Sequence, residues 1–140
     1  MILLDANILI YAYDASSSYH QQARNWLEHA IATETVRLSW TTVLAFLRIT
    51  TNPRAVERPL SHLDACELVS QWMAQPSVGV LAPGARHWSI LRKLIEESGP
   101  RGPLMMDAHL AALAIEYGAV LCTHDRNFAR FAGLRVEYPL

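Results

Sequence analysis

Residues 2–12 read ILLDANILIYA, a run that is apolar except at Asp5 and Asn7. The first three residues predict a short, fully buried strand, and residues 8–13 can begin a helix after it. A charge set into an apolar run costs several kcal/mol of stability unless another group compensates it. The position of Asp5, directly after the strand, therefore marks it as a candidate functional carboxylate.

Along the rest of the chain, short continuous apolar runs, typical of buried strands, alternate with apolar residues at helical spacing. Residues 41–50 and 107–117 have the pattern of helices, and GPRGP at 99–103 predicts a loop. Ser18 and Ser61 are expected to cap the helices that follow them. Further strands are expected at residues 36–38, 78–81, 120–122 and 134–136. This alternation predicts the α/β class, with three α/β/α layers and a mainly parallel central sheet of four to five strands.

Length and composition limit the function. At 140 residues the chain is expected to be one domain, 1–140. Hydrophobic residues make up 51% and charged residues 18%, which excludes an intrinsically disordered protein. A net charge of −1 excludes a globally basic nucleic-acid coat and a polybasic membrane binder, although it allows a local basic patch.

The two cysteines and the N-terminus bear on the compartment. Cys66 and Cys122 lack the spacing of a zinc site, so both are interpreted as buried thiols of a reducing compartment. The N-terminus has no basic segment before its apolar stretch, and no apolar run approaches the length of a membrane span. We therefore expect a soluble, cytoplasmic protein.

Three of the five aspartates are expected at one edge of the sheet. Asp5 and Asp125 lie just past predicted strands, and Asp107 follows the 99–103 loop. If the first and fourth strands are neighbours, these carboxylates meet, and they repel one another unless they are protonated or bridged by a hard divalent cation. Each of them could instead be a helix N-cap, for which aspartate is well suited.

Four segments of the sequence together resemble a known family. They are ILLDANILIYA at 2–12, TTVLAFLRITTNPR at 41–54, MMDAHLAALAIEYGA at 105–119 and VLCTHDRNF at 120–128. In order and spacing they resemble the motifs of the PIN-domain nucleases, most closely the VapC-type ribonuclease toxins. The resemblance covers nearly the whole chain.

This resemblance implies a catalytic site. Asp5, Asp107 and Asp125 match the acids that carry out catalysis and bind Mg²⁺ or Mn²⁺ in such domains. Asn7, Thr123 and Asn127 match polar positions that, in such domains, orient the acids or a metal-bound water. The implied reaction is the hydrolysis of an RNA phosphodiester bond by a metal-dependent endoribonuclease. The implied partners are an RNA substrate, a cognate antitoxin protein and a second copy of the chain in a homodimer.

One departure from the family pattern concerns a fourth acid. The family usually carries a glutamate in the helix after the second strand, whereas here residues 43–45 lead directly to Phe46. Glu116 does not replace it, because nine residues at about 100° each place it on the opposite helix face from Asp107. We expect Glu116 to be exposed to solvent. The missing acid argues against a second tightly held metal ion.

Arginines and alternative functions complete the sequence-based predictions. Arg48, Arg54 and Arg101 lie near the expected acidic edge and are candidates for binding RNA phosphates.

One alternative to the nuclease is a PIN-like module that binds RNA or protein with little catalysis, as the missing glutamate suggests. Another is a phosphatase of the haloacid-dehalogenase type with Asp5 as nucleophile, although such enzymes need an acid where Asn7 stands.

Overall fold

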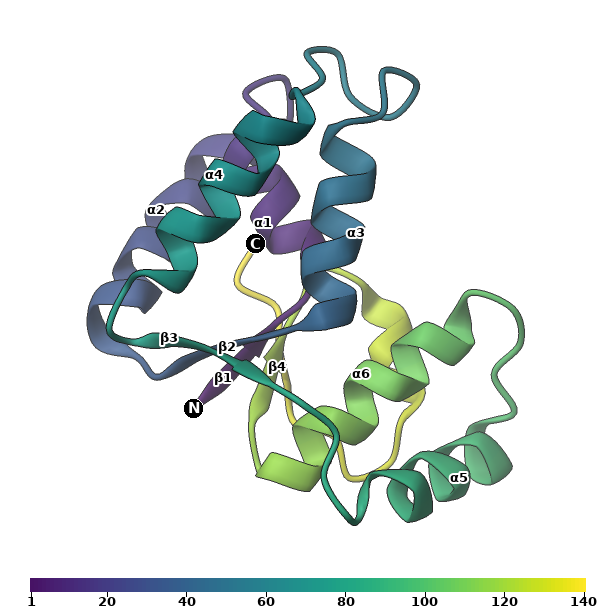
Figure 1. Ribbon diagram of the computed structural model, residues 1–140. Helices are drawn as coiled ribbons and strands as arrows, with labels where there is room; N and C mark the ends of the chain where they lie inside the picture. Colours follow the sequence, from purple (N-terminus) through teal and green to yellow (C-terminus); the bar gives the residue numbers. More distant parts are fainter.

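A five-stranded parallel sheet forms the centre of the molecule (Figure 1). The structure is a computed structural model that describes all residues from Met1 to Leu140. The strands are β1 (Ile2–Leu4), β2 (Val36–Ser39), β3 (Val78–Leu81), β4 (Val120–Cys122) and β5 (Val136–Glu137). Their order in the sheet is β3-β2-β1-β4-β5, which confirms the predicted sheet.

Helices cover both faces of this sheet and complete the three layers (Figure 1). One face carries α1 (Ala6–Tyr13), α2 (His20–Thr33), α3 (Trp40–Thr50) and α4 (His62–Met73). The other face carries α5 (His87–Ser98) and α6 (Leu104–Tyr117). A short 3-10 helix, η1 (Arg126–Arg130), connects β4 to β5. Every helix is too short or too polar to span a lipid bilayer.

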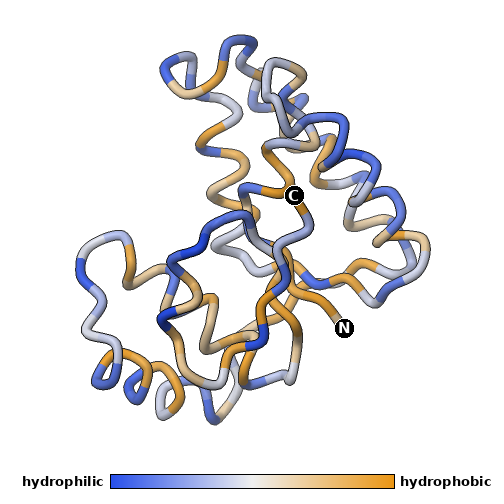
Figure 2. Tube along the Cα trace, turned by 180° about the vertical axis from the view of Figure 1, so that it is seen from behind, coloured by the Kyte–Doolittle hydropathy of each residue, from blue (hydrophilic) through white to orange (hydrophobic).

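Strand β1 is buried on both faces because it lies in the middle of the sheet. Its side chains alternate, as in any strand: Ile2 and Leu4 join the core beneath α1–α4, whereas Leu3 joins the core beneath α5 and α6. Figure 2 shows this N-terminal strand as one of the hydrophobic segments of the chain. A continuous apolar run is what a central parallel strand requires.

The strand order creates a reversal next to β1. From β1 the chain moves outward to β2 and β3, and then crosses back to place β4 on the other side of β1. Ligands of open parallel sheets bind outside the carboxyl ends of the strands at such a point. Asp5 and Thr123 directly follow the two strands that meet there.

Helix α3 is tied to the same end of β1. The Ser39 hydroxyl caps α3 by accepting the Thr42 N–H at 3.0 Å. The Thr42 hydroxyl in turn donates to the carbonyl oxygen of Leu4 at 2.9 Å. These buried contacts fix the first turn of α3 beside Asp5.

Some local expectations were wrong. Ser18 does not cap α2, whose N-cap residue is Tyr19, whereas Ser61 does cap α4. Cys66 is exposed, and only Cys122 is buried. Helix α6 begins at Leu104, so Asp107 lies within its first turn and is not its N-cap.

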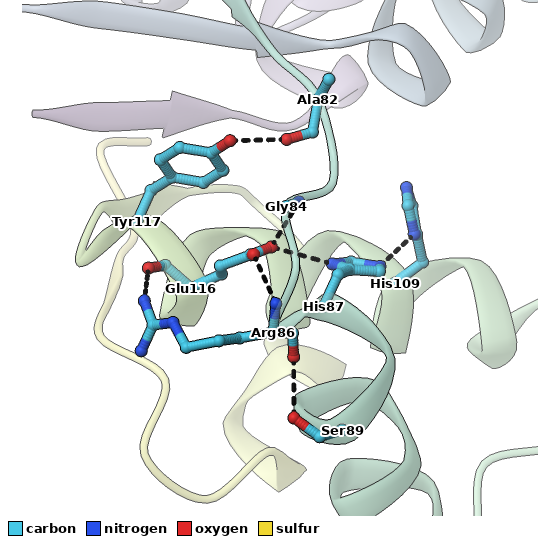
Figure 3. A network of polar contacts seen from close by, with 8 residues as sticks. All are labelled: Ala82, Gly84, Arg86, His87, Ser89, His109, Glu116 and Tyr117. Carbon is cyan, nitrogen blue, oxygen red and sulfur yellow. Dashed lines mark hydrogen bonds and ion pairs between the residues drawn. The ribbon is translucent and has the colours of Figure 1, made fainter.

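Glu116 was also predicted wrongly, because it is buried and anchors the loop between β3 and α5 (Figure 3). Its carboxylate accepts the Gly84 N–H at 3.1 Å and the Arg86 N–H at 3.3 Å. The His87 ring nitrogen Nδ1 lies 3.5 Å from Glu116 Oε2. A Cβ atom at position 84 would come within 2.3 Å of Glu116 Oε1, so this contact requires glycine. Helical periodicity gave the correct face, opposite Asp107, but that face packs against the loop.

Removing this anchor should destabilise the fold. Glu116→Ala leaves the partly buried N–H groups of Gly84 and Arg86 without their acceptor, which should lower the free energy of unfolding by about 1–3 kcal/mol. Urea unfolding followed by circular dichroism measures this value. The matched control is Glu67→Ala on the exposed side of α4, expected to change stability by less than about 0.5 kcal/mol. Equal stabilities of the two variants would contradict the anchoring role.

Candidate active site

Asp5 lies at the junction of β1 and α1 and is held on three sides. Its Oδ1 accepts the Ala6 N–H at 2.7 Å, and its Oδ2 accepts the Thr123 hydroxyl at 2.7 Å and the Asn7 amide at 3.0 Å. Asp5 is therefore the N-cap of α1, as the simpler interpretation held. Burial raises the pKa of Asp5, its hydrogen bonds lower it, and the charge of Asp125 raises it further.

Thr123 and Asn7 connect the two central strands across the sheet edge. The buried Thr123 hydroxyl donates to Asp5 and accepts from the Asn7 amide at 3.1 Å and from the Asp125 N–H at 3.0 Å. The Asn7 side-chain oxygen accepts the His124 N–H at 3.2 Å. Thr123 uses its full hydrogen-bonding capacity within the chain, and Asn7 uses both amide hydrogens and one lone pair of its oxygen, so both side chains hold neighbouring groups in place.

Asp125 caps the 3-10 helix η1 through a 2.8 Å hydrogen bond from the Asn127 N–H to its Oδ1. The Asn127 side chain itself makes no hydrogen bond within the chain and is exposed. Asp125 also lines an open recess, called here the Asp125 recess. Its lining residues are Asn7, Tyr11, His124, Asp125, Arg126 and Asn127.

Asp107 faces Asp5 across a second pocket, the Asp107 pocket, which lies between α3 and the start of α6. Its walls include Asp5, Asp107, Thr41, Ala45 and Arg48. The Asp107 carboxylate is half-buried and has no hydrogen-bond partner within the chain. Burial and the charges of Asp5 and Asp125 raise the pKa of Asp107 to about 6. The three predicted acids thus lie within electrostatic range of one another.

The donor chemistry of this edge fits a hard divalent ion. Carboxylate oxygens are the preferred ligands of Mg²⁺, and a cation would relieve the repulsion that raises the pKa of Asp107. No three acidic, histidine or cysteine side chains converge closely enough to hold a metal ion by themselves. Such an open arrangement suits Mg²⁺, which keeps several waters and is commonly bound by one or two carboxylates together with substrate phosphates.

Helix α3 contributes a wall without a carboxylate. Ala45 lines the Asp107 pocket, whereas Phe46 is fully buried against Trp72 in the core. Of these two neighbouring positions, Ala45 is therefore the one that faces the site. Arg48 lies about one turn further along the same face and also lines the pocket. The side of the site where the family carries an acid thus presents a methyl group and a guanidinium group.

The other two arginines predicted to bind RNA lie outside both pockets. Arg54 and Arg101 are exposed in loops and line neither the Asp107 pocket nor the Asp125 recess. Arg130, which the sequence analysis did not single out, is near enough to lower the pKa of Asp107, against the larger effects that raise it. Its position at the end of η1 could be found only once the placement of η1 beside α6 was known.

The sequence analysis also missed an aromatic cluster beside the acids. The ring of His124 lies 4.4 Å from that of Tyr19 and 5.6 Å from that of Tyr11, measured between ring centres. Burial, the neighbouring Tyr19 and the charges of Asp5 and Asp125 raise the pKa of Tyr11. Nothing in the spacing of these residues along the chain predicts that they meet.

Comparison with known proteins identifies relatives along the full chain. The family model for the PIN domain matches residues 2–134. Ribonuclease VapC37 of Mycobacterium tuberculosis is 37% identical over 140 residues, covering 99% of this chain and 97% of the relative. Ribonuclease VapC25 of the same organism is 39% identical over 143 residues, covering 99% of both chains.

Solved structures agree with the fold. VapBC2 from Rickettsia felis, bound to a DNA fragment from its promoter, superposes with a TM-score of 0.72 at 19% identity over 98% of both chains. VapC20 of Mycobacterium tuberculosis, described as a toxin that cleaves the sarcin-ricin loop, gives 0.66 at 15% identity over 96% of this chain and 99% of that one. From the family match and the full-length identity, this chain belongs to the PIN-domain family and, within it, to the VapC ribonucleases.

Proposed function

We propose that this chain is a metal-dependent endoribonuclease that acts as the toxin of a toxin-antitoxin pair, with residues 1–140 as a single nuclease domain. The observation that carries the proposal is that Asp5, Asp107 and Asp125 lie within electrostatic range of one another at the reversal point of the sheet, where burial and the other two charges raise the pKa of Asp107 to about 6. Full-length relatives named ribonucleases support the reaction class. PIN-domain VapC nucleases are generally dependent on divalent metals, and we propose Mg²⁺ or Mn²⁺ here.

Each residue has a distinct part in the proposed reaction. Asp5 and Asp107 would hold the ion from opposite walls of the Asp107 pocket, and Asp125 would complete the negative edge. A bound divalent ion supplies a more acidic water for attack and offsets the charge that develops on the phosphate. Thr123 and Asn7 keep Asp5 in place through the hydrogen bonds described above. Asn127 is positioned beside Asp125 as a further polar group.

Arg48 is the best placed of the arginines for binding a substrate phosphate. It shares the Asp107 pocket with two of the acids, and a guanidinium group can donate two parallel hydrogen bonds to a phosphate. Arg54 and Arg101 lie outside this pocket and would contact RNA further along its backbone.

A haloacid-dehalogenase mechanism has little support. It requires an acid near Asp5 to move the proton, but the nearest candidate position is Asn7, whose amide donates to Asp5 and Thr123. A non-catalytic binding module is favoured by Ala45, which leaves the α3 wall without a carboxylate. Cleavage assays separate this second candidate from the nuclease.

The proposed partners follow from the relatives and from the surface. Several structural relatives are described as toxin-antitoxin complexes. Near the acids this chain exposes apolar side chains that an antitoxin would cover, namely Leu44 and Met106 in the Asp107 pocket. The homodimer remains a prediction.

We further propose that the protein acts in the cytoplasm, because an RNA substrate and two free cysteines fit that compartment.

Neutralising Asp5 should remove activity without unfolding the protein. Asn at position 5 can still cap α1 but cannot supply the charge that an ion needs, so RNA cleavage should fall at least about a hundredfold. The assay is cleavage of labelled total RNA with Mg²⁺, and circular dichroism checks the fold. The matched control is Asp64→Asn, at an exposed position of α4. Full activity of Asp5→Asn would remove Asp5 from the catalytic set.

Metal binding should depend on pH through Asp107. Because this carboxyl has a pKa of about 6 and must lose its proton to bind an ion, protons compete with the metal. Titration calorimetry with Mn²⁺ should show an affinity that is level above about pH 7 and falls by up to about tenfold per pH unit below pH 6. In Asp107→Asn the affinity should be weaker and its pH dependence flatter. An unchanged pH profile in this variant would contradict the assignment.

The same carboxyl predicts how stability changes when no metal is bound. Its pKa is raised in the folded state from the usual value of 3.8, so between pH 4 and pH 6 the folded protein binds more protons than the unfolded chain. The stabilising effect of the protonated form is present at low pH and is lost as pH rises through about 6. With a chelator present at pH 7, Asp107→Asn should therefore have a free energy of unfolding about 1 kcal/mol above that of the wild type, a value that allows for the partial exposure of the carboxyl. Its melting temperature should be a few degrees higher. Equal melting temperatures would contradict this.

The toxin assignment is tested in cells. Expression of the wild type should arrest growth, and co-expression of the small protein encoded next to it should restore growth. Asp5→Asn should not arrest growth and serves as the control. Growth arrest that the neighbouring protein fails to relieve would contradict the proposed pair.

A further inference from the structure

The Asp125 recess differs in chemistry from the Asp107 pocket on the other side of the acids. Two of its lining side chains are aromatic rings, Tyr11 and His124, and Tyr19 packs behind His124. The recess joins the acidic edge directly, because Asn7 and Asp125 belong to both. A substrate phosphate at the acids would therefore have an aromatic surface immediately beside it.

Three polar side chains around the recess make no hydrogen bond within the chain, although Asn7 and Asp125 do. Neither the Tyr11 hydroxyl nor a ring nitrogen of His124 takes part in a hydrogen bond, and the Asn127 amide is likewise unpaired. By contrast, the histidine pair on the far side of α6 is used internally, since His87 Nε2 and His109 Nδ1 lie 2.9 Å apart (Figure 3). The recess thus combines flat rings with unused donors and acceptors.

Unpaired nucleobases need this combination. A base is recognised by stacking of its face on an aromatic side chain and by hydrogen bonds to its edge. Arg126 lies at the rim, held with its guanidinium carbon 4.0 Å from the centre of the Tyr138 ring. It brings a positive charge to the side of the recess where a further phosphate of the strand would pass.

We propose that Tyr11 and His124 form a subsite for one unpaired nucleobase next to the scissile phosphate of an RNA strand. The inference rests on the proposed nuclease function and adds a specificity-determining site to it. Stacking on His124 holds the base, and the Asn127 amide contacts its edge. Duplex RNA is excluded, because a base held in its stack cannot enter the recess.

Binding of two oligomers tests the subsite. One is a fluorescein-labelled oligoadenylate of about twelve nucleotides. The other is an abasic ribose-phosphate oligomer of the same length and charge. Anisotropy is measured with Mg²⁺ present in the Asp107→Asn background, which is expected to block cleavage and lies outside the recess.

Substitutions within the recess should act on the base-bearing oligomer alone. His124→Ala and Tyr11→Leu should weaken oligoadenylate binding roughly 5- to 100-fold, the range for loss of one stacked base, and leave binding of the abasic oligomer unchanged. His124→Phe keeps a ring and should retain most of the affinity. His29→Ala, an exposed histidine of α2, is the matched control. Melting temperatures confirm that each variant is folded.

The outcomes separate the subsite from the nuclease itself. Equal losses on both oligomers, or no loss on either, overturn the subsite. Cleavage of total RNA by the protein with Asp107 intact is measured in parallel. If the wild type cleaves RNA but the recess variants bind both oligomers as the unsubstituted recess does, the subsite alone is refuted. If the wild type cleaves no RNA, the proposed function is refuted and the subsite with it.

Discussion

The placement of three partly buried, like-charged groups at one edge of the sheet is the constraint on which the proposed site depends. Asp5, Asp107 and Asp125 come from three separate segments, and burial together with the charges of Asp5 and Asp125 raises the pKa of Asp107. Thr123 and Asn7 make this arrangement possible by holding Asp5 between β1 and β4 with direct hydrogen bonds. The tie from Thr42 to the Leu4 carbonyl oxygen fixes the remaining wall. Much of the hydrogen bonding near the sheet edge thus serves to position the acids.

Much of this arrangement was predictable from the sequence, because the spacing of apolar residues along the chain indicates which segments form strands and which form helices. The apolar run at residues 2–4 predicted a buried strand, and the alternation of strands and helices predicted a mainly parallel sheet, as the structure has them. With parallel strands, residues that follow them share one edge, which is why Asp5 and Asp125 were expected together. The proposed roles of the acids extend that reasoning, and the experiments above decide them.

What could not be predicted depends on contacts between distant segments. Glu116 has the spacing of an exposed helical residue, but the loop after β3 folds over it and makes it a buried anchor. The meeting of Tyr11 with His124 similarly depends on how α1 lies against the end of β4. At the α3 wall the motif comparison pointed to Phe46, whereas helix rotation places Ala45 in the pocket. Periodicity gives the face of a helix, but it does not say what covers that face.

The hydrogen bond between Thr123 and Asp5 spans 118 positions of the chain. Strand β4, which carries Thr123 to this point, is also the partner that closes β1 on its second side. During translation, the first two thirds of the polypeptide therefore emerge before the segment that completes the acidic edge. A nascent chain on the ribosome lacks the complete acidic edge until its last segments emerge, so any activity that needs all three acids must wait until synthesis is almost finished.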